Sequence, residues 1–96
     1  MTLHLLKAQL DLPSLLNVLK GFGPQDACLL RDDATFLLLK SDALCALEPV
    51  MENEQLYVLQ EDAETRSIPA VEEGINYIDY TQFVALTLEY SNTISW

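Results

Sequence analysis

The side chains best suited to chemistry in this sequence are two cysteines, Cys28 and Cys45. A cysteine that carries sulfur must be accessible and must have a lowered thiol pKa. Cys28 lies inside an apolar run and is expected to be an inert core residue. Cys45 stands between Leu44 and Ala46 with only Lys40 as a nearby base. A structural role is favoured for Cys45, and it remains a weak candidate for a persulfide carrier.

The remaining polar groups form no recognisable catalytic or metal-binding set. His4 is the only histidine, and we expect it to be satisfied on a first strand or hydrogen-bonded at an interface. The acidic pairs Glu61-Asp62 and Glu72-Glu73 are adjacent in sequence and need not converge, so surface solvation is favoured. Gly21-Phe22-Gly23 precedes a strand instead of opening a helix, which excludes a dinucleotide fingerprint. The sequence therefore predicts no cofactor and no metal.

Composition narrows the class of protein. The chain has 96 residues with 15 acidic and 5 basic side chains, a net charge of −10. Binding of phosphates needs clustered Lys and Arg, so direct nucleic-acid binding is not expected. The half 49–96 holds nine acids against Arg66 alone, which fits either a solvated acidic surface or a docking face for a basic partner.

Localisation follows from three further features. No apolar run approaches the roughly 18–20 residues of a membrane span, and the N-terminus lacks a signal-peptide pattern. Two cysteines are too few for a disulfide scaffold. We expect a cytoplasmic protein without membrane contact.

Short strands and helical segments alternate along the chain. The patterns predict strands over 2–6, 27–30, 56–59 and 76–78, with a last strand carrying Ile94 and Trp96. Helices are expected over 12–19, 61–66 and 80–90. Residues 34–40 fit a strand or a buried helix, and a helix continuing to 48 is favoured because the helical pattern goes on through Leu44 and Leu47. The fold class is therefore α/β, a single layer of mainly parallel strands flanked by helices, in one domain spanning 1–96.

Particular residues set the expected ends of these helices. Asp11 and Asp79 are predicted N-caps, and Gln82 completes a capping-box pair with Asp79. Pro49 is expected to stop the helix before it.

The last predicted helix is apolar over more than one face. Tyr80, Phe83, Val84 and Leu88 form one stripe, which Leu86 and Tyr90 widen. Such a helix is usually covered on more than one side. Both burial by the chain itself and burial at a subunit interface remain open.

Several segments carry a resemblance to a known family. The stretch from Ile78 to Thr87 (IDYTQFVALT) and the closing Trp96 are the strongest, joined by Leu3-His4 and by 57–62 (YVLQED). These segments resemble the TusB/DsrH family of small sulfur-relay subunits over essentially the whole chain. The resemblance implies a DsrE/F/H-like α/β fold.

The resemblance also implies partners. TusB-type members work with sister subunits TusC and TusD as a dimer of heterotrimers, and sulfur passes through TusE toward 2-thiolation of the tRNA wobble uridine. The relay cysteine of that complex lies on the TusD-type subunit. DsrH-type members belong to a sulfur-oxidation complex and carry a cysteine in the first helix, which is absent from 12–19 here. Asp33 stands where the family usually has Gly, and Tyr90 where His is common.

Together these features predict a non-catalytic subunit of a cytoplasmic sulfurtransferase complex serving tRNA 2-thiouridine formation. The expected partners are TusC-like and TusD-like chains, with a TusE-like acceptor reached indirectly. The expected interface residues are Phe83, Leu86, Tyr90 and Trp96. The alternatives are a DsrH-type subunit, a persulfide carrier using Cys45, and a self-associating module without sulfur chemistry.

Overall fold

Five parallel strands form one sheet in a computed structural model that describes residues 1–70 and 74–96. The strand order is β4-β3-β2-β1-β5, and every neighbouring pair is parallel. The strands are β1 (Thr2–Leu6), β2 (Ala27–Leu30), β3 (Leu56–Leu59), β4 (Ile75–Ile78) and β5 (Asn92–Ser95). The predicted α/β class with a parallel sheet is confirmed.

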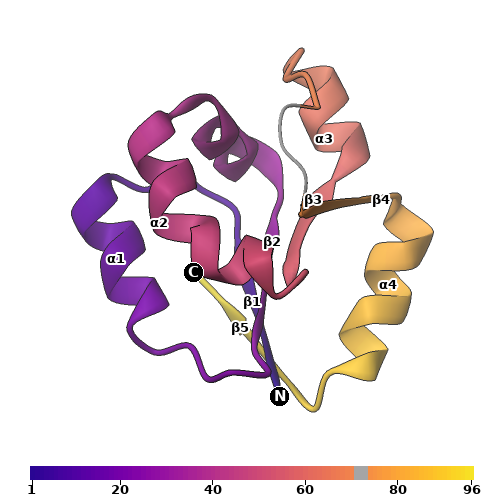
Figure 1. The fold of residues 1–96 in the computed structure, drawn as a ribbon. Helices are drawn as coiled ribbons and strands as arrows, with labels where there is room; N and C mark the ends of the chain where they lie inside the picture. Colours follow the sequence, from indigo (N-terminus) through magenta and orange to yellow (C-terminus); the bar gives the residue numbers. More distant parts are fainter. Residues whose placement is uncertain (71–73) are drawn as a thin grey trace.

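Two layers of helices cover the sheet unequally. On one side lie α1 (Leu12–Leu19), the 3₁₀ helix η1 (Asp32–Leu39), α2 (Ser41–Glu52) and α3 (Gln60–Thr65). Of the helices in residues 1–70 and 74–96, only α4 (Tyr80–Glu89) packs on the other side (Figure 1). The order of the strands explains this arrangement. From β1 to β4 each new strand is added on the same side of the one before, whereas the connection from β4 to β5 returns to the opposite edge of the sheet. Right-handed crossovers place helices on opposite faces for opposite directions of travel.

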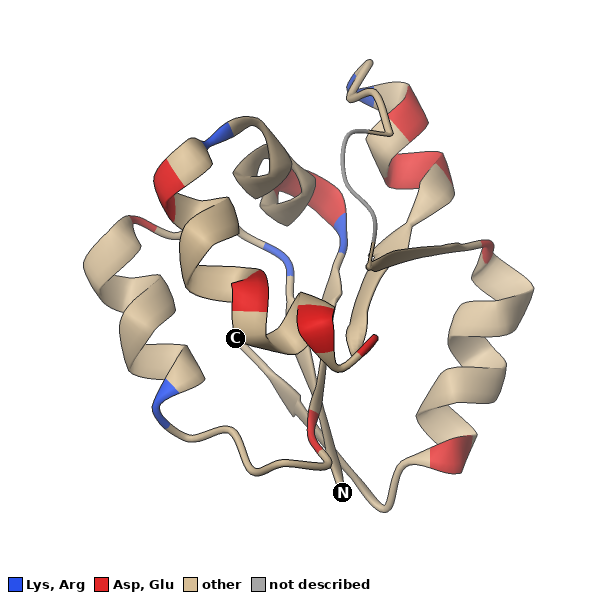
Figure 2. Cartoon of the chain, in the orientation of Figure 1, with Lys and Arg blue, Asp and Glu red and all other residues tan. Residues whose placement is uncertain are grey.

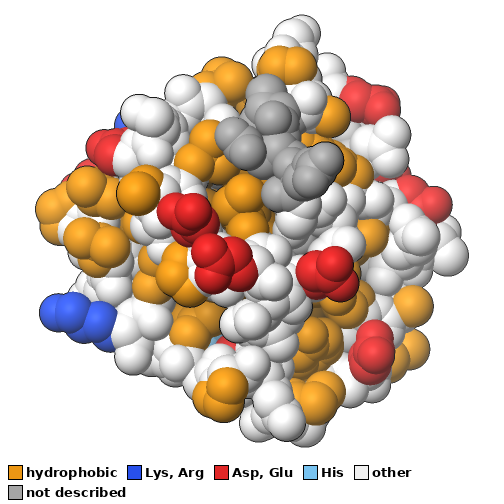
Figure 3. Space-filling view, in the orientation of Figure 1, with side chains coloured by type: hydrophobic (Ala, Val, Ile, Leu, Met, Phe, Trp, Pro, Cys, Tyr) orange, Lys and Arg blue, Asp and Glu red, His pale blue; other side chains and the backbone are white. Residues whose placement is uncertain are grey.

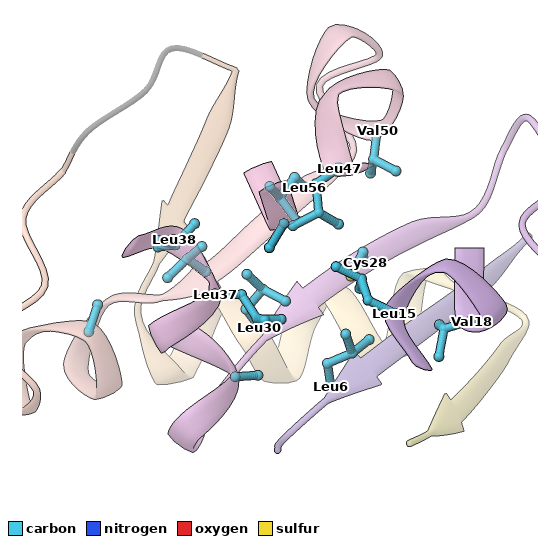
Figure 4. Packing of buried hydrophobic residues seen from close by; sticks show 14 of the residues in the cluster. Leu6, Leu15, Val18, Cys28, Leu30, Leu37, Leu38, Leu47, Val50 and Leu56 are labelled. Atoms are coloured by element: carbon cyan, nitrogen blue, oxygen red, sulfur yellow. The ribbon is translucent and has the colours of Figure 1, made fainter. Parts of the chain in front are cut away.

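The central strand β2 is buried on both faces, as its uninterrupted apolar sequence predicts. Cys28 and Leu30 point into the larger core under α1, α2 and η1, whereas Ala27 and Leu29 face α4. Figure 4 shows Cys28 and Leu30 of the larger core together with Leu6 and Leu56 of the adjacent strands. The sheet thus separates two apolar cores.

The segment from 32 to 52 differs from the sequence prediction in two places. Residues 32–39 form a 3₁₀ helix that ends at Lys40, whose extended backbone (φ −108°, ψ 119°) separates it from α2. The buried pairs Ala34/Leu37 and Thr35/Leu38 are spaced by three residues, which matches the 3₁₀ repeat.

Pro49 lies inside α2 and does not stop it, so that expectation was wrong. Proline removes one helical hydrogen bond, the one to the Cys45 carbonyl. Burial of Leu47 and Val50 on either side of it keeps the helix against the core.

The turn after β2 adopts a backbone conformation that favours glycine, but one residue earlier than the sequence comparison indicated. Asp32 has φ +49°, whereas Asp33, which replaces the family's usual Gly, does not have a positive φ. Asp tolerates this region better than most residues. The Asp62 carboxylate accepts the Asp32 amide at 2.6 Å and so fixes the turn to the start of α3.

The predicted caps of the first and last helices are confirmed. The Asp11 carboxylate accepts the Ser14 amide at 2.9 Å. Asp79 accepts the Gln82 amide at 2.8 Å, and the Gln82 side chain accepts the Asp79 amide at 2.9 Å, which completes a capping box. Among the described residues, no helix has the length and apolar character needed to cross a membrane.

Candidate functional site

Cys28 is enclosed by the larger core and has no access to solvent. Its side chain lies on β2 beneath α1, among apolar neighbours (Figure 4). Burial raises the pKa of the Cys28 thiol to about 12, because the apolar surroundings disfavour the charged thiolate. The expectation that Cys28 is an inert core residue is confirmed.

Cys45 is exposed on the outer face of α2. It borders a shallow surface hollow of about 290 Å³ together with Ser41, Leu44, Glu48 and Met51. In the described part of the chain no hydrogen bond or ion pair reaches its sulfur. The Asp42 carboxylate accepts the Ala43 amide at the helix start, so the positive end of α2 is already matched by a carboxylate. The thiol is accessible but has no activating neighbour there.

The four expected interface residues have different environments. Phe83 and Leu86 are each only 7% exposed and pack in the smaller core against the sheet. Tyr90 is partly buried against the same core, and burial, followed by the neighbouring Tyr57, raises its pKa. Trp96 is about half exposed. Their role at a contact between subunits stays a prediction, and a charged substitution of Phe83 would first disrupt this chain's own core.

The exposed side of α4 is also apolar. Tyr80, Val84 and Leu88 follow each other at intervals of four residues and are 56%, 45% and 82% exposed. Residues spaced by four lie on one face of a helix, so these three form an exposed stripe that the other described residues leave uncovered, named here the outer stripe. The sequence pattern predicts Phe83 in the same stripe, but in the structure Phe83 packs against the sheet.

Most charged side chains serve the structure of the chain itself. Glu61 accepts the Tyr80 amide at 3.1 Å and Asp62 accepts the Asp32 amide, so this pair anchors neighbouring elements instead of only being solvated. Glu72-Glu73 lies outside the described residues. Arg66 forms an ion pair with Asp33 at 3.0 Å, so the guanidinium group of Arg66 already has a partner within the chain.

The described Asp and Glu residues are spread over several helices and loops (Figure 2). On the face drawn in Figure 3 they alternate with apolar side chains. Across residues 1–70 and 74–96, no three His, Cys, Asp or Glu side chains converge as metal ligands.

The structure brings together one group of residues that sequence reasoning missed. His4 on β1 is only 3% exposed, and both of its ring nitrogens have partners. Its Nε2 lies 3.3 Å from the Asp26 carboxylate, and the Trp96 indole N–H donates to its Nδ1 at 3.1 Å. The Phe22 ring stacks on the imidazole at 4.1 Å between centroids. This group, the His4 cluster, confirms that His4 is satisfied on the first strand.

Hydrogen-bond chemistry defines the protonation state of the His4 cluster. The indole N–H can only donate, so Nδ1 of His4 must accept and the proton lies on Nε2, which donates to Asp26. Burial opposes ionisation of Asp26, but hydrogen bonds from the Gly23 and Thr2 amides and from His4 prevail and lower its pKa. No spacing signal reveals the cluster, because His4 and Trp96 are 92 residues apart.

The comparisons with known proteins agree with this architecture. The fold is that of the ychN protein from E. coli, whose crystal structure matches 100% of this chain and 99% of that chain with a TM-score of 0.73 at 10% identity. The family model described as "DsrH like protein" matches residues 8–93. The chain therefore belongs to the DsrH-like family.

Two relatives show the resemblance at the level of sequence. Protein TusB of Salmonella arizonae is 31% identical over 91 residues, covering 93% of this chain and 90% of the relative. Protein TusB of Salmonella paratyphi B is 32% identical over 88 residues, covering 90% and 87%. The resemblance to the TusB/DsrH family predicted from the sequence motifs is confirmed.

Proposed function

We propose that this chain is a non-catalytic, TusB-type subunit of a cytoplasmic sulfur-relay complex that serves 2-thiolation of the tRNA wobble uridine. The observation that carries the proposal is the state of its thiols. Cys28 is sealed in the core with a pKa raised to about 12, and Cys45 is exposed without an activating partner among the described residues. A relay cysteine needs access and an activating neighbour. Cys28 has no access, and no hydrogen bond or ion pair among the described residues reaches the Cys45 sulfur.

The family supports the relay context. The match to the DsrH-like family and the relatives named Protein TusB favour a subunit whose reactive cysteine is supplied by a TusD-like chain, with a TusC-like chain completing the complex. A TusE-like acceptor would then take sulfur without contacting this chain directly. The DsrH-type alternative is disfavoured because α1 (LPSLLNVL) holds no cysteine.

The contact surface of this subunit is proposed to be the outer stripe of α4. Burying a large apolar side chain contributes roughly 1.5–3 kcal/mol, so a few such residues can hold an obligate contact. Tyr80, Val84 and Leu88 satisfy this requirement without disturbing the smaller core behind them. Phe83 and Leu86, two of the interface residues expected from the sequence, would act indirectly by packing α4 against the sheet.

The decisive experiment is sulfur transfer by a reconstituted complex containing Cys45→Ser in this chain. The non-catalytic proposal expects transfer to the acceptor at the wild-type rate, because the serine is nearly isosteric and the thiol takes no part. A Cys28→Ser variant serves as the control for a change of thiol in the core. Loss of transfer with Cys45→Ser in an intact complex would favour the persulfide carrier, for which the exposure of Cys45 is the supporting observation.

A further inference from the structure

The C-terminal strand β5 is held in place mainly by hydrogen bonds. All four of its residues are exposed, and it lies at the edge of the sheet beside β1. Beyond the ladder itself, the Trp96 amide donates to the Leu5 carbonyl at 2.9 Å, and the Ser91 hydroxyl donates to the Met1 carbonyl at 2.8 Å. An edge strand with so little buried surface is sensitive to each bond that holds it.

One of these bonds depends on the protonation of a side chain. We propose that the hydrogen bond between His4 and Trp96 holds β5 in place and is broken when His4 is protonated. This contact, named here the clasp, is closed while Nδ1 accepts the Trp96 indole N–H and open when Nδ1 takes up a proton. An imidazolium donates from both nitrogens. Protonation at Nδ1 therefore places two N–H groups against each other across a distance of 3.1 Å. The hydrogen bond is lost, and the indole is repelled.

The groups around His4 keep their charge while His4 takes up a proton. Asp26 remains a carboxylate over the range in which histidine titrates, because its pKa lies below the ordinary value. The buried Cys28, which pairs with His4 in the ladder, stays a neutral thiol. Phe22, which stacks on the ring, and Ile94, which pairs with His4 in the ladder, carry no titratable side chain. Among these named partners of His4, none changes charge in that range, so opening of the clasp is assigned to the proton that His4 takes up.

The Asp26 carboxylate also makes the open state accessible. A buried imidazolium without a counter-charge would be strongly disfavoured. In this chain the carboxylate lies 3.3 Å from Nε2, and the stacked Phe22 ring offers a favourable face to a cation. Proton uptake can therefore release Trp96 without expelling His4 from its site.

Trp96 is the only tryptophan of the chain, so its fluorescence reports directly on the clasp. We expect acrylamide to quench the isolated wild-type protein more strongly as the pH falls from about 8 to about 5, the range in which histidine changes charge. In His4→Asn the amide oxygen lies close to the position of Nδ1 and can accept the indole N–H, but it does not titrate. Quenching of this variant should stay constant over the same range.

Amide hydrogen exchange gives a second readout that does not depend on the fluorophore. After correction for the intrinsic effect of pH, exchange of the β5 amides should rise about five- to ten-fold at the lower pH, the effect of losing about one hydrogen bond. Amides of the central strand β3 serve as the internal control and should not change. Trp96→Phe lacks the indole donor and should show fast β5 exchange at both pH values.

The proposal is overturned if wild-type quenching is independent of pH, or if His4→Asn shows the same pH response as the wild type. Equal acceleration of β5 and β3 would also contradict it, because that pattern reports global loosening. None of these measurements involves sulfur transfer or a partner chain. Failure of the clasp is therefore distinguishable from failure of the proposed function.

Discussion

At the scale of single residues, neighbours decide what a reactive side chain can do. Cys28 and Cys45 have the same chemistry, yet one is sealed beneath α1 and the other faces solvent on α2. The buried thiol is held neutral by its apolar surroundings. Asp26 shows the opposite effect, since three hydrogen bonds to its carboxylate outweigh the cost of its partial burial.

Asp26→Asn tests this balance through the pH dependence of stability. A carboxyl whose pKa is lowered on folding contributes stability above its unfolded pKa, and the contribution is lost as the pH falls through the folded value. We expect the variant to be less stable by about 2 kcal/mol above about pH 5, where hydrogen bonds to a charged acceptor count fully. The difference should shrink below about pH 4, the ordinary range of an aspartate.

Denaturant unfolding of both proteins across this pH range gives the measurement. A difference that persists undiminished to strongly acidic pH would mean that the charge of Asp26 contributes nothing to folding.

At the scale of elements, α4 differs in position from the other helices of the described residues. It alone among them packs on its side of the sheet, so the smaller core depends on it (Figure 1). Its start is fixed by the capping box of Asp79 and Gln82 and by Glu61, which accepts the Tyr80 amide. Its buried side holds Phe83 and Leu86, while the outer stripe faces away.

Asp79→Ala should therefore destabilise the whole protein through one helix end. Loss of an N-cap costs about 1 kcal/mol, which corresponds to a fall in Tm of about 4–8 °C for a domain of this size. Glu89→Ala is the matched control, because it removes the same charge from the other end of α4. A carboxylate near a helix C-terminus is slightly unfavourable, so the control should keep or raise the Tm. Equal losses in both variants would contradict the capping role.

At the scale of the whole molecule, the sheet divides a heavily covered side from a sparsely covered one. In the part of the chain that the structure describes, three α-helices and one 3₁₀ helix pack on the first side, and α4 alone on the second. The outer stripe lies on this second side. If the partner contact lies there, assembly of the complex covers the face of the sheet that carries α4.

Leu88→Asp tests this placement. Leu88 is 82% exposed, so the substitution should leave the isolated chain folded, as circular dichroism would verify. Loss of one buried leucine at a contact should weaken association with TusC-like and TusD-like chains about ten- to hundred-fold. Gel filtration of the co-expressed proteins should then show smaller species.

The matched control for this test is Leu39→Asp. Leu39 is 56% exposed on η1, which packs on the other side of the sheet, and the chemical change is identical. The control should elute with the wild type. Elution of Leu88→Asp at the wild-type volume would remove the outer stripe from the interface.

Local sequence patterns predicted the five strands and most of the helices of this protein in their order. The all-apolar run 27–30 identified a central strand, and Asp79 with Gln82 identified the start of α4, because burial and capping act over neighbouring residues. The sequence also placed Cys28 in the core. Local patterns predicted the helix end at Pro49 incorrectly, because they do not include the tertiary burial that carries α2 past it.

Contacts between distant parts of the chain follow from the topology of the sheet and not from local sequence. The contact between His4 and Trp96 closes the two ends of the chain on each other, and it exists because β5 returns to pair with β1. The same return places α4 alone on its face, which directs Phe83 inward and Leu88 outward. Sequence periodicity reports that a helix has apolar sides, but the direction of the chain through the sheet decides which side is buried.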